Sequence, residues 1–427
     1  MLTLAVLVFT SVPSPSDDWP QFMGPSGTNT VELAGASFDW AKKPPKVLWR
    51  TALGAGFGGA SVQGGEVFVL DRDPEEFDVL RVFRLADGEE LWSEGYEAKG
   101  RLQFPGSRSV PTVRGDLVYT VGGFGQVTCF DRKAKAVKWS VGLQETYEGE
   151  LPMFGWSCSP LLWKKLVIVT ALGANVGLVA LDAETGKEAW VTEGLGYSHS
   201  TPAVLTLLDE PQIVFLSTDD QASGQDLAAP TRISSFDPDS GERLWTTVTT
   251  LTRLPVPAPL QIDRERLFVT GGYRSGSTMM RLAKKDGAYA VETLFHVERG
   301  SQIHLPLLCG GNLYMLANEN WNDQRNRRTE GGLVCMDLDG KERWRTGEAP
   351  YFGRGSALLV GEHLLIQDGM SGVLRAVRCS PEGYRQVGEV DLFAVGDTRD
   401  HQMWAPMALA DGKLLLRSQE ELLCVQL

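Results

Sequence analysis

The sequence predicts an all-β protein built as a single eight-bladed β-propeller with four-stranded blades. Three observations predict this fold: a short phrase that recurs along the chain, the same order of strand and turn signals around each copy, and complementary fragments of one repeat at the two ends. The clearest copy spans residues 180–190 and reads Ala-Leu-Asp-Ala-Glu-Thr-Gly-Lys-Glu-Ala-Trp. Recurrence at roughly 40–55 residues is typical of repeat proteins, in which each unit packs on its neighbours.

Each repeat begins with a segment that contains Ser or Pro, such as residues 109–111 or 200–202. A turn and an apolar strand follow, and then come a strand that leads to the Asp, a turn, and a strand that carries an aromatic residue. Four short strands joined by turns make one propeller blade. Within the phrase, Asp182 is placed to accept hydrogen bonds from the turn, and Gly186 supplies the positive φ that the turn requires.

The pattern contains eight third strands but only seven fourth strands that follow them. The third strands are expected at residues 81–85, 126–130, 177–181, 232–236, 278–282, 332–336, 373–377 and 422–426. The fourth-strand aromatic residues are Trp92, Trp139, Trp190, Trp245, Phe295, Trp344 and Phe393. The missing strand is expected at residues 47–50, around Trp49. We therefore expect the N-terminal strand to complete the last blade, made otherwise from residues 401–427, and to close the ring.

The fourth-strand tryptophans are expected to be structural, because each can cover the joint with a neighbouring blade. Burying one such ring removes about 150–250 Å² from water, which stabilises the fold by about 4–6 kcal/mol at most. The tryptophans concerned are Trp49, Trp92, Trp139, Trp190, Trp245 and Trp344.

The composition narrows the classes of partner that the protein can bind and the compartment in which it is expected. The net charge of −13 argues against nucleic acid and against an anionic membrane surface, since both are bound by clustered Lys and Arg. Residues 1–17 combine a short apolar run with small residues and Pro, which favours a secretory signal peptide. The alternatives are a mis-assigned start codon and a buried leading strand, because no Lys or Arg precedes the run. We expect residues 18–427 to form a monomeric propeller in the periplasm or outside the cell, without a membrane span.

The cysteine positions do not indicate a disulfide framework. Cys129, Cys335 and Cys424 occupy the slot that Ala180 fills in the clearest repeat. Equivalent slots on different blades lie too far apart to be bridged, so these residues are expected to be small buried hydrophobic side chains. The other three cysteines follow no pattern, and the sequence has no Cys-x-x-Cys motif.

Propellers bind partners at the mouth of the central channel, where the loops that lead into the first strands converge. We call these segments the leading loops. In this chain they are rich in His, Arg and aromatic residues, which suits a polar or anionic ligand. An alternative is that the same side chains only hydrogen-bond to backbone groups and water around the mouth. The candidate binding residues are Arg108, Trp156, Tyr197, His199, His304, Arg354, His401 and Trp404.

No catalytic residues and no metal site are expected. His199, His304 and His401 would need bonds of about 2 Å to one point to hold zinc, and nothing in the sequence indicates such convergence. Ser198 and Ser200 flank His199 but follow one extended segment, and no Gly-x-Ser-x-Gly motif occurs. Two insertions, at residues 218–226 and 318–328, are expected to lengthen hairpins as solvated loops or, around Trp321, as a protein-contact loop.

The phrase A-x-D-x-x-T-G-x-x-x-W at residues 180–190 resembles the repeat of the pyrroloquinoline-quinone (PQQ)-like propellers. A near-copy at residues 235–245 and the lead-in Asp-Trp-Pro-Gln-Phe-Met-Gly-Pro-Ser-Gly at residues 18–27 support the resemblance. That superfamily includes eight-bladed quinoprotein alcohol dehydrogenases and the propeller lipoprotein of the outer-membrane barrel assembly machine. The resemblance implies the fold over residues 18–427, whereas members of one fold perform many functions.

The dehydrogenases of this superfamily bind PQQ with a Ca²⁺ ion, and many carry a disulfide between adjacent cysteines. This chain has no adjacent cysteines and no obvious Asp, Glu and Asn ligand set for calcium. The assembly lipoprotein is anchored through an N-terminal Cys, and no Cys precedes Cys129 here. We therefore expect no cofactor and no lipid anchor, and a binding or scaffold role for a protein or a small polar ligand. A PQQ-dependent oxidoreductase and a cell-envelope assembly component are the alternatives.

Overall fold

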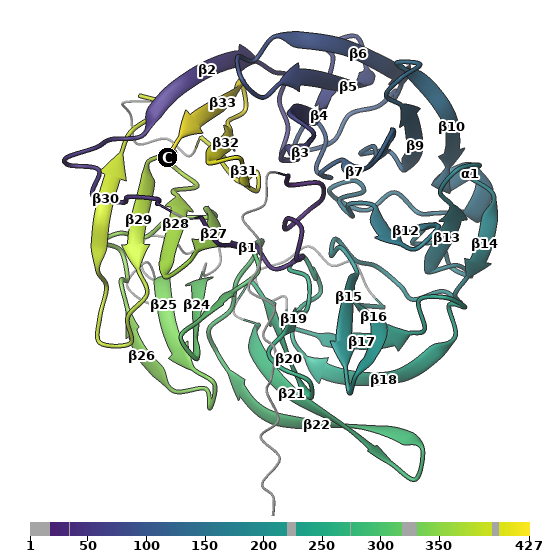
Figure 1. The fold of residues 1–427 in the computed structure, drawn as a ribbon. Helices are drawn as coiled ribbons and strands as arrows, with labels where there is room; N and C mark the ends of the chain where they lie inside the picture. The colour runs from purple at the N-terminus through teal and green to yellow at the C-terminus, as the bar shows by residue number, and fades with distance from the viewer. Residues whose placement is uncertain (1–17, 34, 220–227, 274, 318–330, 395–400) are drawn as a thin grey trace, which may run out of the picture.

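The protein is a ring of eight β-sheets around a central channel (Figure 1). The computed structural model describes residues 18–33, 35–219, 228–273, 275–317, 331–394 and 401–427. The segment at residues 1–17, most of the two insertions and Trp321 lie outside the described residues. The predicted eight-bladed propeller is confirmed, and each predicted third strand overlaps the third strand of one blade.

In blades 1 to 7 the strands follow the chain from the channel outward. Blade 1 contains β3 (Ser61–Gln63), β4 (Glu66–Arg72), β5 (Phe77–Arg84) and β6 (Glu90–Glu97); blade 2 contains β7 (Thr112–Arg114), β8 (Leu117–Val121), β9 (Gln126–Asp131) and β10 (Ala136–Gly142); blade 3 contains β11 (Leu161–Trp163), β12 (Leu166–Thr170), β13 (Leu178–Asp182) and β14 (Glu188–Val191); blade 4 contains β15 (Ala203–Leu207), β16 (Glu210–Ser217), β17 (Pro230–Phe236) and β18 (Arg243–Thr250). Blade 5 contains β19 (Leu260–Gln261), β20 (Arg266–Gly271), β21 (Gly276–Lys285) and β22 (Ala288–Val297); blade 6 contains β23 (Leu307–Cys309), β24 (Asn312–Ala317), β25 (Gly332–Asp337) and β26 (Glu342–Arg345); blade 7 contains β27 (Ser356–Val360), β28 (His363–Gln367), β29 (Leu374–Arg378) and β30 (Gln386–Val390). A single helical turn, α1 (Leu143–Tyr147), follows blade 2.

Blade 8 joins the two ends of the chain, as the sequence predicts. Its strands β31 (Ala408–Ala410), β32 (Lys413–Arg417) and β33 (Glu421–Gln426) come from the C-terminus, and β2 (Lys46–Ala52) supplies the outer strand. Trp49 lies opposite Cys424 in the antiparallel β2–β33 pair. The ring is therefore closed by backbone pairing between the N-terminal and C-terminal parts of the chain.

Four fourth-strand rings pack on a glycine in the turn of the next blade, namely those of Trp49, Trp139, Trp190 and Phe295. Trp139 lies on Gly186, where an added Cβ would come within 2.7 Å of the ring, and Trp190 lies on Gly241 in the same way at 2.5 Å. The indole N–H of Trp139 donates to the carbonyl oxygen of Ala183 at 3.1 Å. The turn glycine thus has a positive φ and also forms the surface on which the tryptophan ring of the preceding blade packs.

The other structural tryptophans also lie at joints between blades. Trp49 packs on Gly88 and donates to Leu85, and Trp344 donates to the carbonyl oxygen of Ser380 in the next blade. Trp92 packs with residues of blade 2, and Trp245 packs with residues of blade 5.

Blade 7 departs from the predicted pattern. Its aromatic slot, opposite Ala376, is filled by Gly388, and Phe393 lies beyond the end of β30. The prediction of Phe393 as a fourth-strand residue is therefore wrong. The space over Gly388 is taken instead by Trp40, whose ring would lie 2.6 Å from an added Cβ. A tryptophan from the N-terminal segment thus replaces the missing side chain of the blade.

The N-terminal segment at residues 18–31 crosses the centre of the ring (Figure 1). Trp19 exchanges two backbone hydrogen bonds of 2.8 Å with Val62 in blade 1, and the Pro20 carbonyl accepts one from Val113 in blade 2. At the other side β1 (Thr30–Val31) pairs in parallel with β27 as a fifth strand of blade 7. The segment therefore ties separate parts of the ring together across the channel.

All six cysteines are free, and Cys129, Cys335 and Cys424 are buried at equivalent positions on β9, β25 and β33. Among the described residues, no helix is long and apolar enough to cross a membrane.

Candidate functional site

The leading loops of all eight blades contribute to one central cavity of about 450 Å³. The N-terminal segment adds Phe22, and the β20–β21 hairpin adds Tyr273. A volume of this size lies in the range of small-molecule pockets. The cavity is lined by Phe22, Phe57, Gln103, Phe104, Arg108, Phe154, Ser157, Ser159, His199, Thr201, Leu254, Val256, Tyr273, Gln302, Ile303, His304, Arg354, Gln402, Trp404 and Pro406.

Aromatic rings form a continuous wall of this cavity. Phe57 stacks on Trp404 with ring centroids 5.2 Å apart and an interplanar angle of 29°. Phe104 contacts both rings edge-on at 5.9 and 5.6 Å, and Phe154 continues the series from Phe104 to His199. Such a wall can pack against the flat face of a ligand.

Two arginines lie against this aromatic wall. The Arg108 guanidinium lies 5.8 Å from the centroid of Phe57, and the Arg354 guanidinium lies 4.8 Å from that of Trp404. Arg108 donates to the carbonyl oxygens of Gly106, at 2.7 Å, and Phe104. Burial is the main cause that lowers the pKa of Arg108 to about 10, so the group remains charged at neutral pH.

The charge around Arg108 is not balanced within the described part of the chain. No described Asp or Glu lines the cavity. Asp78 attracts Arg108 electrostatically, but its carboxylate is paired with Arg72 at 2.9 Å. Together Arg72, Arg108 and Asp78 therefore leave this corner of the cavity with one positive charge. The cavity therefore favours a ligand that carries negative charge.

His304 and Trp404 bring two unpaired polar atoms into the lining. His304 is 7% exposed, and burial lowers its pKa to about 4, although a hydrogen bond with the backbone of Trp404 opposes the shift. Neither His304 Nε2 nor Trp404 Nε1 has a hydrogen-bond partner among the described residues, and both atoms are inaccessible to solvent. A buried polar atom without a partner is costly, so these two atoms lower the stability of this part of the lining.

His199 is also neutral at physiological pH. Burial lowers its pKa to about 4, the charge of Arg108 adds to the shift, and a hydrogen bond with the Gly155 backbone opposes it. Ser157 Oγ lies 3.3 Å from His199 Nδ1 but donates to the His199 carbonyl oxygen at 2.9 Å. A weakly basic imidazole beside a hydroxyl that points its proton elsewhere is a poor arrangement for nucleophilic catalysis. The pair is better suited to binding.

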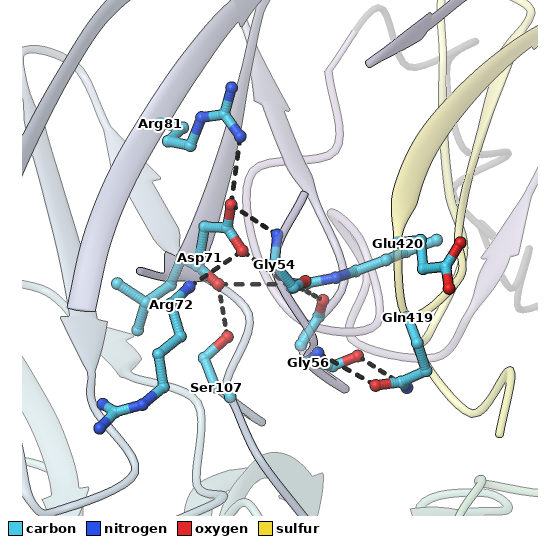
Figure 2. A network of polar contacts seen from close by, with 12 residues as sticks. Gly54, Gly56, Asp71, Arg72, Arg81, Ser107, Gln419 and Glu420 are labelled. Carbon is cyan, nitrogen blue, oxygen red and sulfur yellow. Dashed lines mark hydrogen bonds and ion pairs between the residues drawn. The ribbon is translucent and has the colours of Figure 1, made fainter. Parts of the chain in front are cut away.

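The loop that carries Phe57 is fixed by a polar network at the joint between blades 8 and 1 (Figure 2). Gly54 N donates to Asp71 Oδ2 at 3.1 Å, and Gly56 exchanges two hydrogen bonds with the side chain of Gln419, at 3.2 and 3.1 Å. The buried Arg417 donates to the Gly58 carbonyl oxygen at 2.7 Å. These contacts hold the loop rigidly, which reduces the entropy lost when a ligand binds.

Five of the eight candidate binding residues line the cavity and three do not. Those that line it are Arg108, His199, His304, Arg354 and Trp404. Trp156 is fully buried and donates to the Thr170 carbonyl oxygen at 3.0 Å. Tyr197 bridges to Thr218 and donates its hydroxyl to Glu150, and His401 donates its backbone N–H to Met370. Alternate side chains of an extended segment point to opposite faces, so Ser157 lines the cavity while its neighbour Trp156 enters the core.

Several lining residues are not among the candidates from the sequence. Phe57, Phe104 and Phe154 stand at comparable positions in three successive leading loops, and an alignment of those loops would indicate them. Phe22 and Tyr273 carry no such signal, because the first belongs to the segment across the channel and the second to a hairpin.

The lining residues do not fit a calcium-bound quinone. Calcium takes six or more oxygen ligands, largely from carboxylates, and the described lining contains no carboxylate. Within the described ranges, no group of three or more His, Cys, Asp or Glu could hold a metal ion. We therefore derive no reaction step through such a cofactor.

Solved structures of low sequence identity share the fold. BamB from Moraxella catarrhalis superimposes with a TM-score of 0.58 and 14% identity over 90% of this chain and 98% of that chain. A europium-containing methanol dehydrogenase gives a TM-score of 0.66 and 12% identity over 97% of this chain and 98% of the other. The quinohemoprotein alcohol dehydrogenase from Comamonas testosteroni gives a TM-score of 0.66 and 12% identity over 97% of this chain and 81% of that chain. At such identities the likeness shows the fold alone.

No curated protein sequence matches this chain. One family model, described as outer membrane protein assembly factor BamB, matches residues 75–228 and 229–381, which together make up more than half of the chain. With the eight-bladed ring and its repeated Asp-to-Trp phrase, this match identifies the chain as a member of the PQQ-like propeller repeat family.

Proposed function

We propose that this protein is a binding propeller that takes up a small anionic ligand in the central cavity, without catalysing a reaction. The observation that carries the proposal is the convergence of all eight leading loops on one aromatic cavity whose described lining contains two arginines and no carboxylate. Neutral His199 and His304 suit hydrogen bonding rather than proton transfer at neutral pH. Export to the periplasm or the cell exterior is part of the proposal, and the composition of residues 1–17 supports it.

A thermal-shift screen with organic anions, sugars and nucleotides tests this proposal. A ligand at 100 times its dissociation constant stabilises the folded state by about 2.7 kcal/mol, which is readily detected. The variant Val256→Trp fills part of the cavity and is expected to abolish the shift. Val248→Trp is the matched control, because Val248 lies on β18 and is 61% exposed. A shift that persists in Val256→Trp would place the ligand elsewhere and overturn the proposal.

A second candidate is a component of a cell-envelope assembly. The description of the matching family model favours it. Affinity purification from an envelope fraction tests it, since a scaffold recovers a defined partner with both the wild-type protein and Val256→Trp. Recovery of no partner by either protein would contradict the scaffold role.

A further inference from the structure

Two of the six cysteines lie in contact at the joint between blades 6 and 7. Cys309 is the last residue of β23 in blade 6, and Cys379 directly follows β29 in blade 7. Their side chains share a hydrogen bond, and both pack in the same apolar cluster. Two thiols that share a hydrogen bond already point towards one another, which is the arrangement that a disulfide requires.

Backbone contacts on both sides of the joint fix the position of Cys379. Its N–H donates to the carbonyl oxygen of Glu362 in the β27–β28 turn at 2.8 Å. The indole N–H of Trp344, on the fourth strand of blade 6, donates to the carbonyl oxygen of Ser380 at 2.8 Å. The residue after Cys379 is therefore tied to the blade that carries Cys309, so the two thiols are held together by both blades.

The cysteine pair lies near the face of the ring opposite to the leading loops. Successive strands of a blade run in opposite directions, so the first and third strands both end on that face. Cys309 is 9% exposed and is followed by an exposed turn at Gly310 and Gly311, and Cys379 is half-buried beside the exposed Arg378. A small thiol reagent can therefore reach the pair from solvent.

Cys309 is the more nucleophilic thiol of the pair. The hydrogen bond from Cys379 lowers the pKa of Cys309, although burial and the charges of Glu362 and Glu32 oppose the shift. The same hydrogen bond raises the pKa of Cys379. Burial raises the pKa of the other four cysteines, all within the described residues, to about 11 or 12. The thiolate is the attacking species in disulfide exchange, so Cys309 is expected to react first.

Cys335 is also near this pair but has another partner. It is fully buried on β25 and shares a hydrogen bond with the hydroxyl of Tyr314. Cys335 is therefore shielded from reagents and is not expected to compete with Cys379 for Cys309.

We propose that Cys309 and Cys379 form a redox-active dithiol, which a disulfide oxidant converts into a disulfide bond between blades 6 and 7. Oxidised glutathione represents this class of oxidant, which an exported protein meets and which the cytosol keeps reduced. The site lies away from the central cavity, so the inference goes beyond the proposed function and does not depend on it.

The reaction proceeds in two exchanges. The Cys309 thiolate attacks one sulfur of oxidised glutathione, so a mixed disulfide forms, the S–S bond of the oxidant breaks and one glutathione thiolate leaves. Because Cys309 no longer holds the Cys379 proton, Cys379 loses that proton to water, attacks Cys309 Sγ and releases the second glutathione. The two cysteine sulfurs lose two electrons in total, and their two protons pass through solvent to the two glutathione thiolates. An excess of a reducing thiol reverses both steps.

Treatment of the folded wild-type protein with oxidised glutathione tests the proposal. The remaining thiols are blocked with N-ethylmaleimide, and the intact mass and the proteolytic peptides are measured. We expect the loss of two hydrogen atoms, four of the six thiols still free, and one linked pair of peptides that contains Cys309 and Cys379. Dithiothreitol should restore all six thiols. Six free thiols after oxidation, or a link between any other two cysteines, would overturn the proposal.

Two double variants show whether the bond holds the joint between the blades. Cys309→Ala/Cys379→Ala removes the pair, and Cys129→Ala/Cys424→Ala is the matched control, because Ala180 fills the corresponding position in blade 3. Oxidation should raise the thermal unfolding midpoint of the wild type and of the control by about 3–5 °C and leave that of Cys309→Ala/Cys379→Ala unchanged. An equal rise in the variant without the pair would overturn the assignment.

Alkylation by iodoacetamide at pH 7.5 tests the role of Cys379 as hydrogen-bond donor. Cys309 should react at least about threefold more slowly in Cys379→Ala than in the wild type, because its thiolate loses the donor. Cys379→Ser should retain most of the rate, since a hydroxyl can also donate. An unchanged or faster reaction of Cys309 in Cys379→Ala would contradict this role.

Discussion

Arg417 Nη2 lies 3.4 Å from Asp71 Oδ1 across the joint at which the last blade meets the first. Both side chains are buried, and Arg417 also donates to the carbonyl oxygens of Gly54 and Gly58. Burial lowers the pKa of Arg417 to about 10 despite the attraction of Asp71, so the arginine stays charged. This contact joins residues 346 positions apart and sits beside the loop that carries Phe57.

The first prediction concerns this ion pair. Arg417→Met leaves the carbonyl oxygens of Gly54 and Gly58 without this donor, whereas Asp71 keeps its ion pair with Arg81 at 3.2 Å, so we expect a loss of about 1–3 kcal/mol in the free energy of unfolding. Arg264→Met is the control, because Arg264 and Asp209 form an ion pair that is largely exposed. That variant should lose less than about 1 kcal/mol. Urea unfolding measures both, and equal losses would contradict a structural role for the buried pair.

The second prediction concerns the platform on which Trp139 packs. Gly186→Ala is expected to destabilise the protein by at least about 3 kcal/mol, because the new methyl group meets the ring and φ is positive. Gly115→Ala has a similar positive φ of 60° but nothing within 4 Å, so only the backbone strain of about 1–2 kcal/mol remains. Thermal unfolding compares the two variants. A similar loss for both would show that the tryptophan contact contributes little.

The third prediction concerns the exceptional slot of blade 7. Trp40→Ala should cost about 3–5 kcal/mol by leaving a cavity over Gly388. Gly388→Phe should be less destabilising in the Trp40→Ala background than in the wild type, because only the Phe38 carbonyl oxygen, 2.7 Å from an added Cβ, then remains in its way. In the wild-type background the same substitution should destabilise by collision with Trp40. If Gly388→Phe has the same effect in both backgrounds, the two residues do not share one space.

The fourth prediction concerns acid stability. The pKa of His199 and of His304 is about 4 in the folded state, against about 6.5 when unfolded. The histidines of the unfolded state therefore take up protons first as the pH falls. The stability that the two neutral histidines contribute is fully present above about pH 6.5 and is lost as the pH falls through 4. By pH 4.5 each histidine should account for a loss of roughly 2–3 kcal/mol.

Urea unfolding of the wild type and of the double variant His199→Gln/His304→Gln at pH 7.5 and 4.5 measures this effect. The carboxylates titrate in both proteins, so the difference between the two proteins isolates the histidines. An equal fall in both would mean that the two imidazoles are not held neutral in the fold.

The ring and its closure could be predicted from the sequence because both depend on local, repeated signals. The Asp-to-Gly turn and the following tryptophan define the third and fourth strands of a blade without any long-range information. The surplus third strand near Cys424 and the unpaired fourth strand around Trp49 then have only each other as partners. The prediction for blade 7 is partly wrong because Trp40 reaches Gly388 from a segment outside the repeats.

The cavity is harder to predict because it depends on the direction of single side chains. Trp156 and Ser157 are adjacent in the sequence, yet one enters the core and the other lines the cavity. Which of the two side chains faces the cavity depends on the register of the leading loop, and the amino-acid composition of the loop does not indicate it. Phe22 lines the same cavity because residues 18–31 cross the channel, a long-range arrangement that no motif indicates.

The ligand-binding role of the central cavity is tested most directly by the indole N–H of Trp404. In a ¹⁵N-resolved spectrum its signal is identified by its loss in Trp404→Phe, and Trp163, whose N–H already pairs with Asp239 at 2.8 Å, provides an internal reference. On addition of an anion that stabilises the wild type in the thermal-shift screen, the Trp404 signal should shift because its ring lines the cavity, while the Trp163 signal stays in place. A Trp404 signal that does not move at a saturating ligand concentration would contradict this role.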